Sequence, residues 1–395
     1  MPKRSKRSKE DKEAGPPAKK RGRPSKNENQ ELPKPEPTYP ESGLGQPIIE
    51  LGQATPRVNT SGLATFPDEL LLEVMSYYPP IPLPTVEPQP PIDADAQIER
   101  RETLAALSHT CSNLRRFFRP YIWQRIEVVS GMPVGNRRRV GKKTKANERL
   151  SNQELLRQLE IVTIRDTSLS EYVNVINVEI KDYSSHSVLE ELARCMAVFP
   201  NLHTVKLLVL VDPLNAFDTE KIFAKHSYPQ IRTAMVSTRG FPLLRSCPGV
   251  QFAYSTEDCK TGHLTRVMLH SCPLLQNLYL DVPEAGLEEI VSAFPEVRTL
   301  ELHFGMLGFS LHAPSFALIS GFKRLKNLEL RAAGSITHNM KDEVLVWAKN
   351  LLLELQKVDK EEKLLCLYYS EPSDDYLTKE ISIVLPVPEP LQGER

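Results

Sequence analysis

The side chains most able to bind a metal in this sequence are two cysteines and two histidines that lie close together in the chain. They are spaced Cys259-x3-His263-x6-His270-x-Cys272. Thiolate sulfur and imidazole nitrogen are ligands that Zn²⁺ prefers, but structural zinc sites usually space their ligands differently. Cys272 is also expected to pack in the core, because it is the first residue of an apolar sequence motif that recurs along the chain and is described below. We therefore expect structural cysteines and ordinary histidines here, with no bound metal and no cofactor.

Motifs for covalent or phosphate chemistry are not found in the sequence. It has no Walker phosphate-binding loop, no Gly-x-Ser-x-Gly nucleophile turn and no His-Glu-x-x-His pair. Acids such as Glu73, Asp93 and Asp95 have no neighbour that marks a pocket, and acid–base catalysis needs a positioned partner. The sequence therefore predicts a protein that is not an enzyme.

The six cysteines are scattered along the chain, in too irregular a pattern for a disulfide framework. No apolar run approaches the length needed to cross a bilayer, and no hydrophobic segment follows Met1-Pro2-Lys3-Arg4. We expect a reducing intracellular compartment and no membrane contact.

The charge of the chain is unevenly distributed. The formal net charge is zero, yet residues 1–26 hold eleven Lys or Arg against three acids. Two basic clusters, at 3–7 and 19–21, are similar to a bipartite nuclear import signal. The second continues as Arg21-Gly22-Arg23-Pro24, which looks like the AT-hook core, whose arginines enter the narrow minor groove of A·T-rich DNA. Residues 1–26, called the head below, therefore indicate a nuclear protein. Contact of Arg21–Pro24 with DNA is a second prediction, which does not exclude the first.

The segment after Leu63 predicts a short amphipathic helix. Pro67 fits the first turn of a helix, and Asp68 and Glu69 would face the positive end of its dipole. Its apolar residues recur at helical spacing and are Leu70, Leu71, Val74, Met75 and Tyr78.

A second helix is predicted from Arg101 to Pro120, where the ring of the proline would end it. Its single apolar stripe is Leu104, Leu107, Cys111, Leu114 and Phe118. Between the two helices, an insert at 79–98 is predicted to be an extended, polyproline-like spacer as far as Pro91.

The two helical segments together resemble the F-box, the adaptor-binding motif of cullin–RING ubiquitin ligase receptors. The resemblance is carried by Leu63, Phe66-Pro67-Asp68-Glu69-Leu70-Leu71 and Val74-Met75, then by Leu104-x-x-Leu107-Ser108-x-Thr110-Cys111-x-x-Leu114-Arg115 and Trp123. It implies docking on a Skp-type adaptor, and through it on a cullin–RING ligase, by Leu63, Phe66, Pro67, Leu70, Leu71, Val74, Leu104, Leu107 and Trp123. Phe66 stands where the family usually has leucine. The alternative is a helical hairpin that only packs on the next domain.

From about residue 155 onward one apolar sequence motif recurs. Its clearest copies begin at Phe199-Pro200, Cys272-Pro273 and Phe294-Pro295, and Phe322 opens a copy without the proline. If Leu202, Ile231, Val250, Leu275, Val297 and Leu325 are equivalent, the steps are 29, 19, 25, 22 and 28 residues, close to the period of leucine-rich repeats. Each copy predicts a short strand with alternate residues pointing inward, and helical stretches between the strands.

This motif resembles the repeats of leucine-rich-repeat receptors, in which the repeat domain often follows an F-box. The resemblance implies a target protein bound at outward strand positions, which register alone places at His203, Lys206, Asn277, Tyr279, Arg298, Glu301 and Glu329. The alternative is another α/β array such as a doubly wound sheet, although no Gly-rich phosphate turn follows these strands.

The sequence as a whole predicts an α/β protein. The expected parts are a disordered basic tail at 1–60, a small F-box-like helical domain at 61–128, a basic linker at 129–154, an irregular leucine-rich-repeat solenoid at 155–385 and a tail at 386–395. We interpret the chain as a non-catalytic substrate receptor of a Skp–cullin–F-box (SCF) ubiquitin ligase, acting on an unidentified target protein in the nucleus. The alternative from another class is a chromatin-associated scaffold that binds A·T-rich DNA through its head.

Overall fold

The computed structural model describes residues 62, 65–78, 81–85, 91–129, 145–211, 218–257, 261–282, 286–305, 317–370 and 379–387. All of these belong to the compact unit Arg57–Arg395. The predicted basic tail, with its AT-hook-like Arg21–Pro24, lies outside the described residues. So do Leu63, Cys259 and residues 130–144 of the predicted basic linker.

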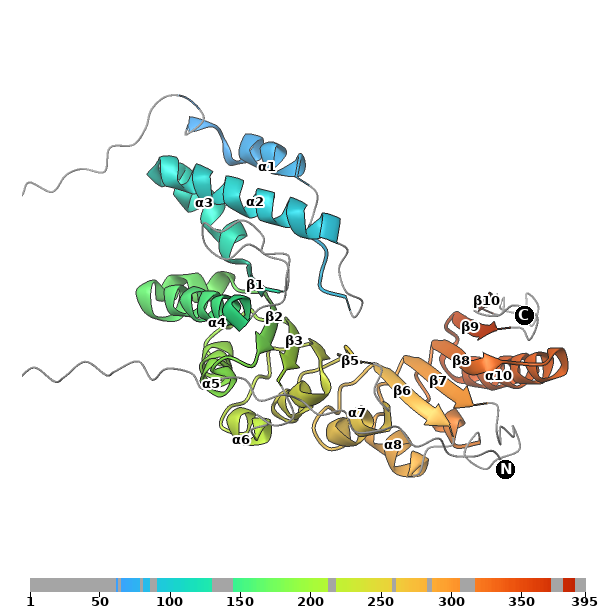
Figure 1. Ribbon diagram of the computed structural model, residues 1–395. Coiled ribbons are helices and arrows are strands. Elements are labelled where there is room, and N and C mark those ends of the chain that lie inside the picture. The colour runs from blue at the N-terminus through green and yellow to red at the C-terminus, as the bar shows by residue number, and fades with distance from the viewer. Residues whose placement is uncertain are drawn as a thin grey trace, which may run out of the picture. The chain divides into compact units, whose positions relative to one another are not determined.

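Three helices form a small unit in the N-terminal part of the described chain (Figure 1). They are α1 (Asp68–Ser76), α2 (Pro91–Thr110) and α3 (Ser112–Trp123). Helix α1 begins as predicted, directly after Pro67 and with Asp68 and Glu69 in its first turn. The unit has an apolar core of its own, made by Leu71, Met75, Leu104, Leu114 and Phe118.

Two boundaries predicted for these helices are wrong. The single helix expected from Arg101 to Pro120 is broken at Cys111, which is extended at φ −160° and ψ 170°, and Pro120 lies inside α3. A proline removes only one intrahelical hydrogen bond, and Tyr121 and Ile122 after it pack against the core of the unit, which favours continuing the helix. Helix α2 begins at Pro91, inside the insert predicted at 79–98 and well before the helix start predicted at Arg101. Proline at the first helical position accounts for that start.

The ten described strands form two five-stranded sheets. Sheet A contains β1 (Arg125–Val128), β2 (Val175–Lys181), β3 (Thr204–Leu210), β4 (Thr233–Val236) and β5 (Phe252–Ser255), all parallel. Sheet B contains β6 (Asn277–Val282), β7 (Thr299–Gly305), β8 (Asn327–Ser335) and β9 (Lys363–Ser370), which are parallel, and β10 (Lys379–Leu385), which is antiparallel to β9. The chain is therefore α/β, as predicted. A doubly wound sheet is excluded for these strands, since their spatial order follows chain order without a reversal.

Helical segments follow the strands and pack on one face of the sheets (Figure 1). They are α4 (Lys145–Glu160), the π-helical turn Ile161–Arg165, the 3₁₀ turn Thr167–Tyr172, α5 (Ser185–Met196), α6 (Thr219–Phe223), the 3₁₀ helix Thr238–Ser246, α7 (Thr261–Met268), α8 (Leu287–Ala293), the 3₁₀ turn Ile319–Gly321 and α10 (His338–Asp359). Two expectations are corrected here: residues 145–154 of the predicted linker are helical, and the sheet begins at Arg125 rather than after residue 155. The face that carries no helices is called the open face below.

The six positions matched in the sequence have the same place in the structure. Leu202, Ile231, Val250, Leu275, Val297 and Leu325 are fully buried, and each lies two residues before a strand. In each case the backbone N–H donates to the carbonyl of the bulky residue three positions earlier, at 3.1–3.4 Å; those residues are Phe199, Tyr228, Cys247, Cys272, Phe294 and Phe322. A shared turn therefore leads into β3 through β8.

The two sheets meet at the edges β5 and β6, where the backbone N–H of Gln276 donates to the carbonyl of Gln251 at 2.7 Å and a side-chain amide adds two further bonds. Strands β5 and β6 are the adjoining edges of sheets A and B, and the side-chain amide of Asn277 bridges them. Its Oδ1 accepts from the backbone N–H of Ala253 at 2.9 Å, and its Nδ2 donates to the Ala253 carbonyl at 3.0 Å. The amide thus replaces two bonds of a strand ladder, in a site where Asn277 is only 3% exposed.

We expect Asn277→Ala to lower the free energy of unfolding by about 1–3 kcal/mol, since two buried backbone groups of Ala253 lose their partner. Urea unfolding followed by circular dichroism measures the loss. The matched control is Asn327→Ala at the equivalent start of β8, where the side chain makes one bond, to Thr299 Oγ1 at 3.3 Å. Equal losses for the two variants would contradict this role for Asn277.

Candidate protein-binding surfaces

Helix α1 carries apolar side chains on its solvent side. Phe66 is 44% exposed, Leu70 50% and Tyr77 80%, and Val74 lies half-buried between them. The spacing from Leu70 to Val74 to Tyr77 places the three on one side of the helix. These four residues are called the α1 strip. Because Leu71 and Met75 turn inward to the core of the unit, the strip is left on the surface.

The residues that the F-box resemblance assigns to adaptor binding are divided among several places. Phe66, Pro67, Leu70 and Val74 lie on or beside the α1 strip. Leu71 and Leu104 are buried in the core of the helical unit, and half-buried Leu107 packs against it. Trp123 packs against the larger core of the sheets. Tyr77 was missed, although its spacing of seven residues from Leu70 could have indicated it.

The open face of the sheets is built from alternate strand residues. Cross-strand register aligns Glu127, Asn177, Lys206, Met235 and Tyr254 in sheet A, and Tyr279, Glu301, Glu329 and Cys366 in sheet B. The residues next to them in sequence, such as Val178 and Leu302, belong to the core on the helix side. Since neighbouring strand residues point to opposite faces, the first set faces away from the helices.

The predicted target-binding residues differ in exposure and in the contacts that they make. Arg298 is exposed before β7, and Tyr279, Glu301 and Glu329 are half-buried on the open face. Lys206 is buried, with its Nζ donating to the Thr85 carbonyl. His203 is half-buried, and burial together with the charge of Arg232 lowers its pKa. Asn277 is turned toward β5, so its amide serves the sheet junction.

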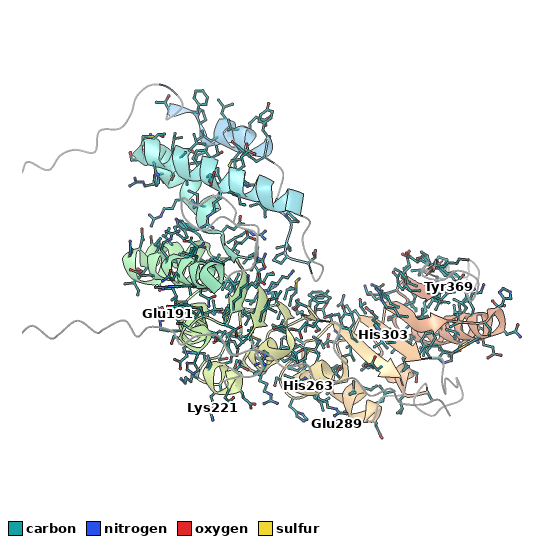
Figure 2. All side chains as sticks on the ribbon, viewed as in Figure 1. Glu191, Lys221, His263, Glu289, His303 and Tyr369 are labelled. Atoms are coloured by element: carbon teal, nitrogen blue, oxygen red, sulfur yellow. The ribbon has the colours of Figure 1, made fainter. Side chains whose placement is uncertain are left out.

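The open face of sheet B holds a network of charges and aromatic rings around Glu301. Its Oε1 lies 2.5 Å from Nε of Arg331 and 2.6 Å from Nε2 of His303, which Figure 2 labels. The Arg331 guanidinium also stacks 4.4 Å from the centre of the Tyr368 ring. Burial and the nearby Glu301 charge raise the pKa of Glu329. The sequence reasoning missed His303 and Arg331, which lie two residues beyond the predicted outward positions Glu301 and Glu329 and so on the same face, and Tyr368, which lies opposite Arg331.

The sequence raised a possible metal site at Cys259, His263, His270 and Cys272. The three of these residues that the structure describes do not form one. The His263 ring lies 5.4 Å from the Phe241 ring, whereas His270 is exposed near Glu289. Cys272 is buried among backbone carbonyls, and burial raises the pKa of its thiol to about 12. Within the described ranges, no group of three or more His, Cys, Asp or Glu residues is placed to hold a metal ion.

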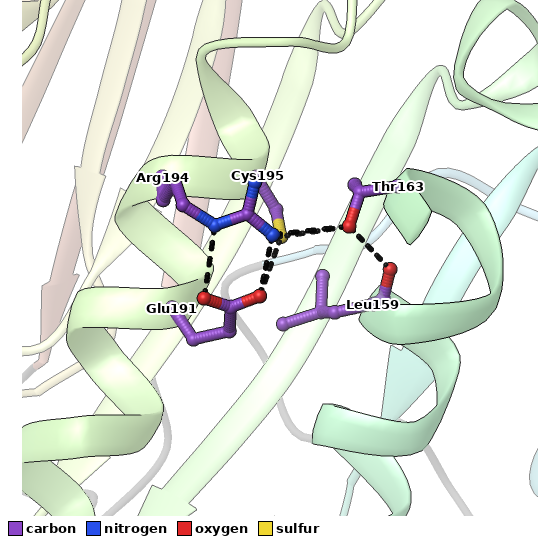
Figure 3. Close-up of polar contacts among 5 residues, drawn as sticks. All are labelled: Leu159, Thr163, Glu191, Arg194 and Cys195. Atoms are coloured by element: carbon purple, nitrogen blue, oxygen red, sulfur yellow. Dashed lines mark hydrogen bonds and ion pairs between the residues drawn. The ribbon is translucent and has the colours of Figure 1, made fainter. Parts of the chain in front are cut away.

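A second buried thiol lies where α4 runs into the π-helical turn beside α5 (Figure 3). Arg194 donates to Glu191 at 2.9 Å and to Oγ1 of Thr163 at 3.1 Å, and that hydroxyl donates to the Leu159 carbonyl. Burial raises the pKa of the Cys195 thiol to about 12. The thiol is therefore protonated at neutral pH. The hydrogen bond from Arg194 to Thr163 joins α5 to the π-helical turn that follows α4.

None of the described helices is both long and apolar enough to span a bilayer. No family model matches the sequence, and no curated protein matches it significantly. The surfaces described above are therefore the basis for a functional proposal.

The raised pKa of Glu329 makes a pH dependence testable. A carboxyl whose pKa is higher in the folded state than its ordinary 4.5 stabilises the fold below that pH and loses the contribution as pH rises through the folded value. The stability of the wild type relative to Glu329→Gln should therefore fall as pH rises above 4.5. Thermal unfolding at a series of pH values measures it.

Glu191 provides a control of opposite sign. Its hydrogen bonds from Arg194 lower its pKa, so its contribution is present above the ordinary value of 4.5 and is lost as pH falls below it. The stability of the wild type relative to Glu191→Gln should rise with pH. The same slope for both variants would contradict the assigned environments.

Proposed function

We propose that this protein is the substrate-recognition subunit of an SCF-type ubiquitin ligase. The observation that carries the proposal is the α1 strip: Leu70 on α1, with Phe66 and Tyr77 beside its two ends, is exposed although the inner side of the helix packs into an apolar core. Large exposed apolar side chains gathered on one helix face are typical of a helix-binding contact. A Skp-type adaptor is the partner that the F-box resemblance gives for this surface.

The strands support the second half of the proposal, that the chain carries irregular leucine-rich repeats. Successive strands lie in chain order, and the same turn leads into each of β3 through β8. Repeats that stack on their neighbours in this way offer a continuous open face on which a target protein can bind. The charged and aromatic network around Glu301 is one part of that face.

In this proposal the chain breaks no covalent bond itself. It binds the adaptor through α1 and a target through the repeats, and so holds the target near a ubiquitin-loaded enzyme. Transfer then takes place within one assembly, at a high effective concentration of the target. The basic head, as a nuclear import signal, would bring the complex to nuclear targets.

We expect Leu70→Asp to weaken binding to a purified Skp-type adaptor at least about tenfold, since a charge would be buried in an apolar contact. Isothermal titration calorimetry with the full chain measures the affinity. Leu70 is suited to this test because it lies outside the core of the unit, whereas Leu71 is 3% exposed and its replacement would disturb the fold.

The matched control is Leu353→Asp on α10, since Leu353 is 44% exposed and Leu70 is 50% exposed. The control should bind the adaptor as tightly as the wild type. The proposal fails if the wild-type chain does not bind the adaptor, or if the two variants lose the same affinity.

A further inference from the structure

A proline-rich segment of the chain, Ile81–Thr85, lies against the open face of sheet A. Nη1 of Arg125, at the start of β1, donates to the carbonyl oxygen of Pro82 at 2.7 Å. Nζ of Lys206, on β3, donates to the carbonyl oxygen of Thr85 at 2.5 Å. Pro84 is buried between these two contacts in the chain. Cations from two strands thus hold the backbone of one extended segment.

The two cations are held in place by the sheet itself. Arg125 donates through Nε and Nη2 to Oε1 of Glu127, at 2.9 and 2.5 Å, and both side chains are less than a tenth exposed. Lys206 is 7% exposed, and burial lowers the pKa of its amine. Buried cations of this kind need an acceptor, because their desolvation is costly. The backbone carbonyls of an extended segment supply one to each.

One polar group of this face is not used by the segment. Asn177 lies on β2, in register with Glu127 on one side and Lys206 on the other. It is 3% exposed, and its Oδ1 has no hydrogen-bond partner in the part of the chain that the structure describes. Prolines have no N–H to donate, so Pro82 and Pro84 cannot satisfy it. A segment with an N–H at this point would make one more buried hydrogen bond.

Open space adjoins the segment on the side of Arg125. A cavity of about 490 Å³ is lined by Leu83, Arg125, Val175 and His203, and a second of about 230 Å³ by Ile81, Arg125 and Glu127 among others. Both adjoin Ile81 and the Arg125 guanidinium. Ile81–Thr85 therefore does not fill the space beside Arg125.

We propose that Arg125, Asn177 and Lys206 form a binding site for an extended segment of a target protein, and that Ile81–Thr85 is a built-in competitor for it. The proposal rests on the proposed function only in taking the partner to be a ligase target. The two cations recognise backbone carbonyls, and Asn177 favours a ligand that presents an N–H where this chain has proline. A target must outcompete a tethered segment, whose effective concentration is on the order of millimolar.

The test uses the full chain and a fluorescein-labelled peptide with the sequence of residues 79–88, followed by fluorescence anisotropy. In one variant Ile81–Thr85 is replaced by glycine and serine at unchanged length. This variant should bind the peptide at least about tenfold more tightly than the wild type, since the competitor is gone. Equal affinity for the two proteins, or no binding to the variant, would overturn the proposal and leave Ile81–Thr85 as a structural strap.

Two further variants sharpen the result. Adding Lys206→Ala to the replaced chain should weaken peptide binding about tenfold, because a charged hydrogen bond is lost. Lys225→Ala is the matched control, since Lys225 pairs with Glu190 on the helix side of sheet A; it should leave the affinity unchanged. Should the replaced chain fail to fold, Pro84→Gly alone removes the buried ring, and it should bind the peptide more tightly than the wild type. An unchanged affinity for this milder variant also counts against the proposal.

Failure here is distinguishable from failure of the ligase proposal. The peptide assay contains no adaptor, and the loop replacement leaves the α1 strip intact, so adaptor binding should be the same in both proteins. Peptide competition without adaptor binding would leave the site standing and overturn the ligase proposal. Adaptor binding without peptide competition would do the reverse.

Discussion

Before each of β3 through β8, the N–H of a fully buried apolar residue two positions ahead of the strand donates to the carbonyl of the residue three positions earlier. The apolar side chains at both positions are sealed in the core, so the backbone groups around them need partners within the protein. The turn satisfies one pair and directs the next strand alongside the last. Where the strand ladder is interrupted, at β5 and β6, the Asn277 amide takes the place of backbone groups. The parallel open face follows from this repetition.

The helical unit depends on a different constraint. A helix as short as α1 is not stable by itself, so it must be held by the apolar face that it buries. Leu71 and Met75 provide that contact with α2 and α3, which frees Leu70 and Phe66 to remain on the surface. The unit can therefore present apolar side chains to a partner without losing its own core. Pro82 and Thr85, which follow α1 in the chain, contact sheet A, so the two proposed binding surfaces adjoin one stretch of sequence.

Sequence reasoning predicted the parts of the fold whose spacing is local. The turn before β6 could be found because Cys272, Leu275 and Leu278 keep fixed offsets, and the same holds for β7 and β8. Strand β1 could not, since Arg125–Val128 has no bulky residue at the expected offset and is buried partly through ion pairing. The break at Cys111 was hidden because that residue continues an apolar stripe at helical spacing. Periodicity also could not divide Leu70 from Leu71, because it locates an apolar face but not which of its residues a neighbouring helix covers. The contact of Ile81–Thr85 with Arg125 and Lys206 joins residues far apart in the sequence, where no local pattern applies.

Hydrogen–deuterium exchange of the full chain, alone and with an equimolar Skp-type adaptor, tests the central claim most directly. The account predicts slower exchange on adaptor binding in peptides that cover residues 66–77, while the strands of both sheets keep their rates. Unchanged exchange across residues 66–77, or protection confined to the strands, would contradict it.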